Sequence, residues 1–229
     1  MNHLRHLSAS LLNLIFPPIC RCCKDSYADK WFCDPCWQLL AFGCWSSRCR
    51  HCFEETENLL CDVCRKQPLL CFPRVRLFDT SPAAHILRQH LEEIEETLAA
   101  MAFVFWDHLE LAHPDVVMAV PDEKGTNHSF QIARYLARLF NRPCIQGLKR
   151  AYSGYLEPDM VLSCATEPEQ VILLLDVASS IPWLQKASLK AADFFPKKAF
   201  VISMFESPQE SEGNIEVTSR NQGQQRVER

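Results

Sequence analysis

Residues 20–64 read CRCCKDSYADKWFCDPCWQLLAFGCWSSRCRHCFEETENLLCDVC and contain four Cys-x-x-Cys pairs. A Cys-x-x-Cys turn directs two thiolates toward one point, and two such turns together close a tetrahedral S4 site of the kind that zinc prefers. Four pairs therefore predict two structural zinc ions. The predicted metal ligands are the eight cysteines of these pairs: Cys20, Cys23, Cys33, Cys36, Cys49, Cys52, Cys61 and Cys64.

Spacing leaves open how the four pairs combine. Sequential use, the first pair with the second and the third with the fourth, makes two zinc ribbons in tandem. Interleaved use makes one cross-braced unit. The pairs are separated by nine, twelve and eight residues, which leaves room for a short hairpin or knuckle inside each site. We favour the sequential order.

Two other uses of cysteine fit this stretch less well. A disulfide framework needs an oxidising compartment and a secretory signal, but residues 1–16 have a brief apolar part and no small-residue cleavage site follows them. A thioredoxin-like redox site needs one Cys-x-x-Cys beside a βαβ pattern, whereas here four pairs lie among turn residues. We expect a cytoplasmic zinc protein.

Composition indicates a globular chain without a general affinity for nucleic acids. The 229 residues are 48% hydrophobic and 23% charged, with a net charge of -4 and only 6 glycines. Residues 1–76 hold ten Lys/Arg and seven Asp/Glu, so the cysteine-rich part is mildly basic and the rest acidic. Because each S4 zinc site carries a net charge of about -2, two zinc sites would offset this excess. A strong electrostatic hold on phosphates is not predicted.

The N-terminal segment has the pattern of a short amphipathic helix that packs on the zinc module. Pro17 and Pro18 end it, and no stretch reaches the roughly twenty apolar residues of a membrane span. Its apolar residues at helical spacing are Leu4, Leu7, Leu11, Leu14 and Ile15. The predicted organisation is an N-terminal helix at 1–16, a double zinc ribbon at 17–66, a linker at 67–73, an α/β domain at 74–205 and a disordered polar tail at 206–229.

The remainder of the chain alternates apolar strand patterns with helical patterns. Strands that alternate with helices indicate an α/β fold with a largely parallel sheet. Strands are predicted at 75–79, 115–120, 144–148, 171–175 and 199–205, and helices at 82–112, 130–140 and 184–195.

Parallel sheets bind ligands at the carboxyl ends of their strands, and two loops meet this condition. One follows Val120 and comprises residues 121–124. The other follows Leu175 and places an acid before small hydroxyl residues, so that it can present backbone N–H groups to a phosphate. An acid in this position also commonly caps the next helix. The candidate site residues of the second loop are Asp176, Val177, Ala178, Ser179 and Ser180.

The order of these elements resembles the ComF/GntX competence-protein family. The resemblance rests on a leading helix that ends in Phe-Pro-Pro, the four cysteine pairs, the strand at 74–76, the Val120-Pro121 strand end and an apolar strand that ends in Asp-Val. It covers roughly residues 8–205. It implies a double zinc ribbon before a type I phosphoribosyltransferase domain, with phosphoribosyl pyrophosphate (PRPP) and magnesium as ligands of the family's site.

The resemblance is weaker in the loops of that site. The family has two acids and then a Thr-Thr-Gly-Ala-Thr-like loop, which cradles the 5-phosphate of PRPP. Here Asp176 matches the second acid, and Ser179 and Ser180 stand in for the threonines. The departures are Leu175 for the first acid, Ile181 for the glycine, Pro182, which lacks an amide N–H, and the bulky Trp183.

We therefore expect a phosphoribosyltransferase-like zinc protein without transferase activity. The resemblance implies a role in DNA uptake or in handling incoming single-stranded DNA during natural transformation, with single-stranded DNA and proteins of the uptake machinery as partners. One alternative is an active transferase in which Asp176 holds the ribose hydroxyls and Ser179 and Ser180 contact the phosphate of PRPP, with magnesium. Another is a zinc ribbon that only docks proteins, and it predicts no single-stranded DNA binding even at low salt.

Overall fold

The computed structural model describes residues 19–25, 28, 31–43, 46–68, 70–153, 157–162, 170–194 and 196–206, with backbone only at 151–153 and 157–162. The predicted helix at 1–16 lies outside these residues, as does the predicted tail apart from Glu206. No helix in the described ranges is long and apolar enough to cross a membrane.

The centre of the structure is a five-stranded sheet in the order β1-β7-β6-β2-β3, in which every neighbouring pair is parallel. The predicted parallel α/β class is therefore confirmed. The strands are β1 (Arg74–Arg76), β2 (Val116–Ala119), β3 (Cys144–Ile145), β6 (Val171–Asp176) and β7 (Lys198–Ser203).

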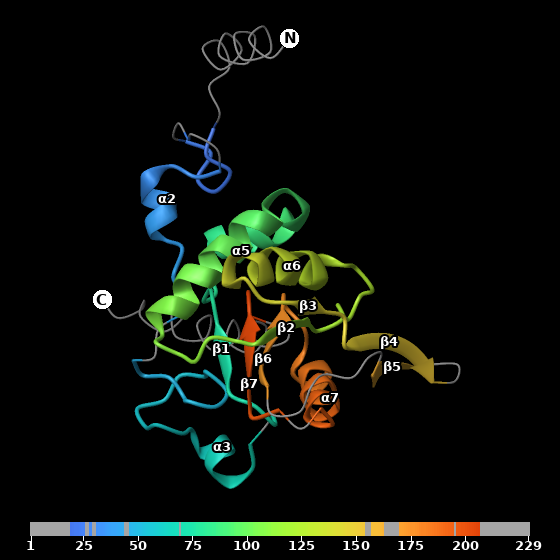
Figure 1. Ribbon diagram of the computed structural model, residues 1–229. Helices are drawn as coiled ribbons and strands as arrows, with labels where there is room; N and C mark the ends of the chain where they lie inside the picture. The colour runs from blue at the N-terminus through green and yellow to red at the C-terminus, as the bar shows by residue number, and fades with distance from the viewer. Residues whose placement is uncertain are drawn as a thin grey trace, which may run out of the picture.

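Helices cover both faces of the sheet, as Figure 1 shows. Successive side chains of a strand point to opposite faces, so a strand that is apolar throughout needs cover on both sides. In β6, Leu173 and Leu175 belong to the core on one face, while Ile172 and Leu174 belong to the core on the other. On the first face lie α4 (Pro82–Gln89), α5 (Leu91–His108) and α6 (His128–Phe140), and on the second lies α7 (Ile181–Ala192).

Two elements differ from the predicted pattern. The helical run at 82–112 is two helices, because the chain turns at His90, where φ is -119° and ψ is 34°. An antiparallel hairpin, β4 (Leu148–Ser153) with β5 (Glu157–Leu162), was not predicted beyond its first residue. Its strand sequences, LKRAYS and EPDMVL, lack a continuous apolar run and one contains a proline, so neither matches the buried-strand pattern.

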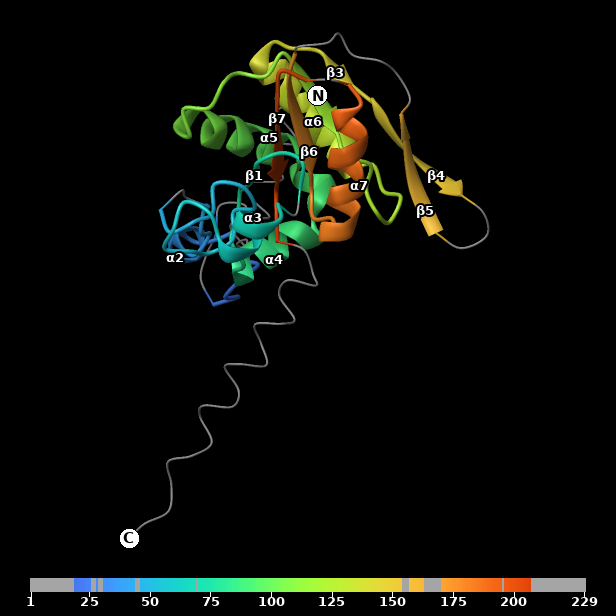
Figure 2. The same ribbon diagram turned by 90° about the horizontal axis from the view of Figure 1, so that it is seen from below.

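The segment with the second cysteine group packs along β1, and the β4–β5 hairpin lies on the opposite side of the molecule (Figure 2). The amide of Arg74 donates to the carbonyl of His51 at 2.7 Å, and the amide of Gly43 donates to the carbonyl of Leu77 at 2.9 Å. A Cβ at Gly43 would lie 2.2 Å from a backbone oxygen, so this contact requires glycine. Leu70, in the segment predicted as a linker, is buried in the core beneath α7.

Candidate functional site

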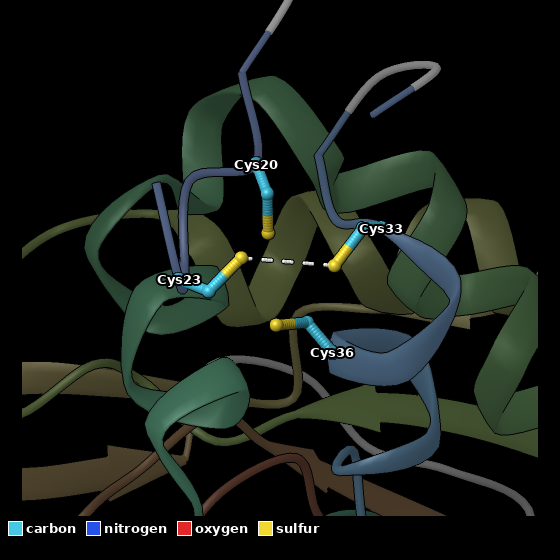
Figure 3. A group of neighbouring side chains, drawn as sticks. All are labelled: Cys20, Cys23, Cys33 and Cys36. Carbon is cyan, nitrogen blue, oxygen red and sulfur yellow. Dashed lines mark hydrogen bonds between the residues drawn. The ribbon is translucent and has the colours of Figure 1, made fainter. Parts of the chain in front are cut away.

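The eight cysteines of the four pairs form two groups of four in sequential order, Cys20/Cys23/Cys33/Cys36 and Cys49/Cys52/Cys61/Cys64. In each group all Sγ atoms lie within 4.8 Å of one another. Figure 3 shows the four side chains of the first group pointing toward a common centre. The Sγ atoms of Cys23 and Cys33 lie 3.8 Å apart and those of Cys52 and Cys61 3.6 Å apart, which matches the edge of about 3.8 Å that a tetrahedron with Zn–S bonds of about 2.3 Å requires. Each group could hold one zinc ion.

Both groups use the same local structure for their second cysteine pair. Cys33 and Cys61 are the N-cap residues of two five-residue helices, α2 (Asp34–Gln38) and α3 (Asp62–Lys66). In the second group the amide of Cys64 donates to Cys61 Sγ at 3.4 Å, and the amide of Cys61 donates to Cys49 Sγ at 3.3 Å. Such N–H···S bonds stabilise thiolates, the form of cysteine that binds metal.

The first cysteine of each group is set up as a thiolate. Burial raises the pKa of Cys20, but hydrogen bonds from backbone amides, including that of Cys33, outweigh burial and lower the pKa to about 6. Burial also raises the pKa of Cys49, but hydrogen bonds from the backbone amides of Cys52 and Cys61 outweigh burial and lower the pKa to about 6. Burial together with neighbouring thiols raises the pKa of Cys36 and Cys52. Four thiols this close together hinder one another's ionisation. A bound cation would stabilise all four as thiolates.

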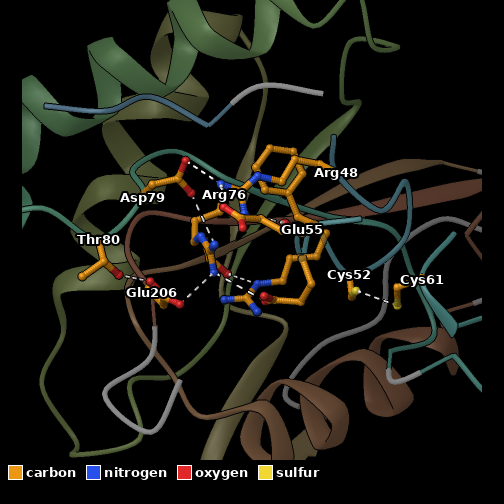
Figure 4. Close-up of polar contacts among 12 residues, drawn as sticks. Arg48, Cys52, Glu55, Cys61, Arg76, Asp79, Thr80 and Glu206 are labelled. Carbon is orange, nitrogen blue, oxygen red and sulfur yellow. Dashed lines mark hydrogen bonds and ion pairs between the residues drawn. The ribbon is translucent and has the colours of Figure 1, made fainter. Parts of the chain in front are cut away.

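An ion-pair network joins the second cysteine group to the sheet (Figure 4). Its centre is Arg76 of β1, whose side chain is only 4% exposed and lies 3.3 to 3.6 Å from the carboxylates of Asp79, Glu54 and Glu206. Arg48 also pairs with Asp79, at 2.8 Å. Because Arg48 and Glu54 flank Cys49 and Cys52 in the chain, the network fixes this cysteine pair to the edge strand.

The first cysteine group is attached at the break between α4 and α5. The Arg21 guanidinium lies 3.8 Å from the centre of the Trp31 ring and 3.1 Å from His90 Nδ1. It also pairs with Glu93 at 3.4 Å. The ring of Trp31 meets His90 edge-on at 5.1 Å between centroids. The two cysteine groups thus dock on different parts of the α/β fold.

The two predicted loops meet at the carboxyl edge of the sheet, around a cleft of about 530 Å³. We call it the loop cleft. The loop after β2 contributes Asp122, Glu123 and Lys124, and the loop after β6 contributes Val177 to Ser180. Arg88 from α4 adds a cationic side chain. The sequence predicted that both loops lie at this edge of the sheet. Nothing in it indicated Arg88, which comes from a helix distant in the chain from both loops.

Asp176 does not line this cleft. It is fully buried, and both of its carboxylate oxygens accept from the amide of Ser179, at 3.2 and 3.3 Å. Burial raises the pKa of Asp176, although the hydrogen bond from Ser179 and the charge of Arg74 oppose that rise. Of the five candidate residues, Val177, Ala178, Ser179 and Ser180 line the cleft, whereas Asp176 stabilises the turn beneath them.

Because the pKa of Asp176 is raised in the folded state, the free energy of unfolding should depend on pH through this residue. Between the unfolded value of about 3.9 and the higher folded value, the native state binds more protons, so the free energy of unfolding falls as pH rises. Asp176→Asn lacks this dependence. In urea unfolding from about pH 4 to about pH 8, wild type should lose stability relative to the Asn variant, by about 1.4 kcal/mol for each pKa unit of the rise.

The matched control for that series is Asp193→Asn, because Asp193 is an exposed residue at the end of α7. If the difference in unfolding free energy between wild type and Asp176→Asn stayed constant with pH, or shifted in favour of wild type as pH rises, the pKa of Asp176 would not be raised by burial in the folded state.

A carboxylate of the protein itself occupies the N-terminus of α7. Glu123 Oε2 accepts from the amide of Ser180 at 3.1 Å, and Glu123 Oε1 accepts from the Ser180 hydroxyl at 3.1 Å. Ser180 is the N-cap residue of α7, and Pro182 in the first turn has no N–H. Helix N-termini attract anions, so Glu123 satisfies the position that an anionic ligand would otherwise take.

The adjacent Asp122 occupies the N-terminus of α6 in the same way. Its carboxylate accepts from the amides of His128 and Ser129, at 2.8 and 3.2 Å, and from the hydroxyl of Thr126 at 2.6 Å. The loop after β2 therefore supplies two consecutive acids that cap the two helices bordering the loop cleft. The sequence showed both acids, but only the fold reveals which amides they meet.

Trp183 is turned away from the loop cleft. It is buried in the core between α7 and the sheet, and its Nε1 donates to the carbonyl of Pro121 at 2.6 Å. The bulky ring thus does not fill the cleft. Instead it ties the start of α7 to the loop that carries Asp122 and Glu123.

Comparisons with known proteins give a likeness in structure but no match in sequence. No protein-family model matches the sequence, and no curated protein matches it. Among solved structures, a hypoxanthine-guanine phosphoribosyl transferase from L. donovani is similar with a TM-score of 0.37 and 16% sequence identity, over 55% of this chain and 77% of that chain.

Proposed function

We propose that this chain is a phosphoribosyltransferase-like zinc protein of the ComF type, without transferase activity, that assists the handling of single-stranded DNA during natural transformation. The absence of transferase activity is inferred from one contact: both carboxylate oxygens of Glu123 accept hydrogen bonds from Ser180 at the N-terminus of α7. In the family that the sequence resembles, this loop cradles the 5-phosphate of PRPP.

Three features of the loop cleft argue against PRPP as a ligand. The Glu123 carboxylate would repel a phosphate and already uses the Ser180 amide. Pro182 supplies no N–H to the first turn of α7. Asp176, which an active enzyme would use for the ribose hydroxyls, is buried and bonded to Ser179. Magnesium is implied only together with PRPP, so the proposal includes no magnesium.

A calorimetric titration of the zinc-loaded protein with PRPP and magnesium tests this part. We expect no saturable heat, because Glu123 already bonds to Ser180 at the N-terminus of α7 and Asp176 is fully buried. An active phosphoribosyltransferase titrated in the same buffer shows that the ligand is intact. Saturable binding by wild type would support the alternative of an active transferase.

Two zinc ions are proposed as structural cofactors. The donor set of four thiols, the sequential grouping and the Sγ distances all fit S4 zinc sites. Held this way, zinc would fix the knuckles of residues 20–36 and 49–64, and no chemistry of the loop cleft would depend on it.

The single-stranded DNA part rests on the first zinc knuckle. Trp31 is half-buried, and the Arg21 guanidinium stacks on its ring. Aromatic rings with arginine beside them are the platforms on which single-stranded bases stack, and each stacked base contributes about 1–3 kcal/mol. Binding there should be salt-sensitive, because arginine contacts with phosphates release counterions.

Fluorescence anisotropy with a labelled oligothymidylate at low salt tests this second part. Trp31→Ala should weaken binding by at least about fivefold, as expected for one lost stacked base. Trp37→Ala is the matched control, because Trp37 is also half-buried but packs edge-on against Phe32. No binding by wild type would favour the alternative of a zinc ribbon that docks only proteins, and unchanged transformation in a deletion strain would refute the biological role.

A further inference from the structure

An apolar groove of about 730 Å³ runs along α5, between this helix and the chain at residues 42–43. We call it the α5 groove. Val104 and Phe42, which both line it, are 67% and 48% exposed. Apolar patches of this kind on a protein surface commonly mark a docking site.

The groove follows one seam of α5. Thr97, Met101, Val104 and His108 recur at intervals of four, three and four residues, which is the spacing of a helix surface that receives another helix. The opposite side of α5 is already used, because Leu98, Ala102 and Trp106 are buried in the core over the sheet. The seam is thus an additional helix-packing surface.

The chain enters the fold close to one end of this groove. Arg21, two residues after the first described residue, lies 3.1 Å from His90 and 3.4 Å from Glu93, at the N-terminal end of α5. Thr97, where the groove begins, is one helical turn beyond Glu93. Residues 1–18 therefore precede the described chain at the position from which they can run along α5.

The sequence of residues 1–16 has a matching seam. Leu4, Leu7, Leu11 and Ile15 are spaced by three, four and four residues. From Leu4 to Ile15 a helix rises about 17 Å, the same rise as from Thr97 to His108, because each span covers eleven residues. A helix that ends near Glu93 must run antiparallel to α5, and this direction aligns the two seams.

We propose that residues 1–16 form a helix that packs antiparallel on α5 and covers the α5 groove. This occupant is part of the same chain, and the proposal places it on α5 rather than on the zinc module, as the sequence alone suggested. The proposal is independent of the function proposed above. The antiparallel register also brings together the charged side chains Arg5 and Asp107, the first being the only Lys or Arg in residues 1–18. The register pairs Ile15 with Thr97, Leu11 with Met101, Leu7 with Val104, Leu4 with His108 and Arg5 with Asp107.

Site-specific photo-crosslinking in the full-length, zinc-loaded protein tests this inference. With p-benzoylphenylalanine in place of Val104, irradiation should join position 104 to the tryptic peptide of residues 6–21, which contains Leu7 and Leu11, within a single chain. The matched control places the crosslinker at Leu139, which is 47% exposed on α6 and does not line the groove. That position should give no crosslink to residues 6–21.

A second variant separates packing from mere proximity. Leu7→Asp/Leu11→Asp should abolish the crosslink at position 104 and leave the zinc content unchanged, since neither residue is a cysteine ligand. The inference is overturned if position 104 gives no crosslink, if the crosslink joins two chains, or if it persists in the double-aspartate variant. A crosslink between chains would assign the groove to a second copy of the protein.

Discussion

Cys49→Ser or Cys64→Ser should release one of two zinc ions and destabilise the whole α/β body, rather than the knuckle alone. Apparent zinc binding free energies of structural sites are about 10–16 kcal/mol, comparable with the entire stability of a typical domain. The second cysteine group is joined to β1 by the Arg74 amide and by the Arg76 network. We therefore expect the variants to unfold at a denaturant midpoint well below that of wild type.

The measurement combines zinc content per chain with urea unfolding followed by far-ultraviolet circular dichroism, which reports on the helices of the α/β fold. Cys71→Ser is the matched control, because Cys71 is an exposed cysteine outside both groups. It should keep two zinc ions and the wild-type midpoint. A Cys64→Ser protein that retained two zinc ions, or that unfolded at the wild-type midpoint, would contradict the structural role of this site.

Arg76→Met should lower the free energy of unfolding by about 3–5 kcal/mol, the range found when one partner of a buried ion pair is removed. The Arg76 side chain is 4% exposed and faces the carboxylates of Glu54, Asp79 and Glu206. Its loss would leave these acids close together without their shared cation. Glu206, which also accepts a hydrogen bond from Thr80, would lose its ion pair with β1.

Arg65→Met provides the matched comparison for Arg76. Arg65 also forms an ion pair, with Asp62 at 3.5 Å, but these side chains are 57% and 84% exposed. Exposed pairs contribute about 0–1 kcal/mol, because solvent screens the charges. Chemical unfolding of both variants measures the two losses in the free energy of unfolding. Equal small losses would show that the Arg76 network does not bind the second zinc knuckle to the sheet.

Local patterns in the sequence predicted the parts of the structure that depend on local spacing. The cysteine pairs needed only their own intervals to indicate two S4 groups, and the apolar run at β6 indicated a strand buried on both faces. The loops after Val120 and Leu175 were correctly placed at one edge, because parallel strands end there together.

The rest depended on contacts between residues distant in the chain. The break at His90 is where Arg21 and Trp31 dock, and nothing in the apolar spacing of residues 82–112 marks it. The contact of Glu123 with Ser180 spans 57 positions. Asp176 was a candidate ligand-binding residue from its place after a strand, but it is fully buried, and the groups that act on its carboxylate include Arg74 of β1 and Ser203 of β7.

The acids of the loop after β2 thus take up the N-termini of the two helices that border the loop cleft. Asp122 and Glu123 bond to the N-termini of α6 and α7, and Trp183 holds their loop against α7.

The most direct test of this account is a calorimetric titration of PRPP with magnesium into wild type and Glu123→Ala, side by side. We expect no saturable heat for wild type and weak saturable binding for Glu123→Ala, because removal of the carboxylate frees the Ser180 amide and hydroxyl at the N-terminus of α7. Saturable binding by wild type that Glu123→Ala leaves unchanged would contradict the claim that Glu123 closes the site.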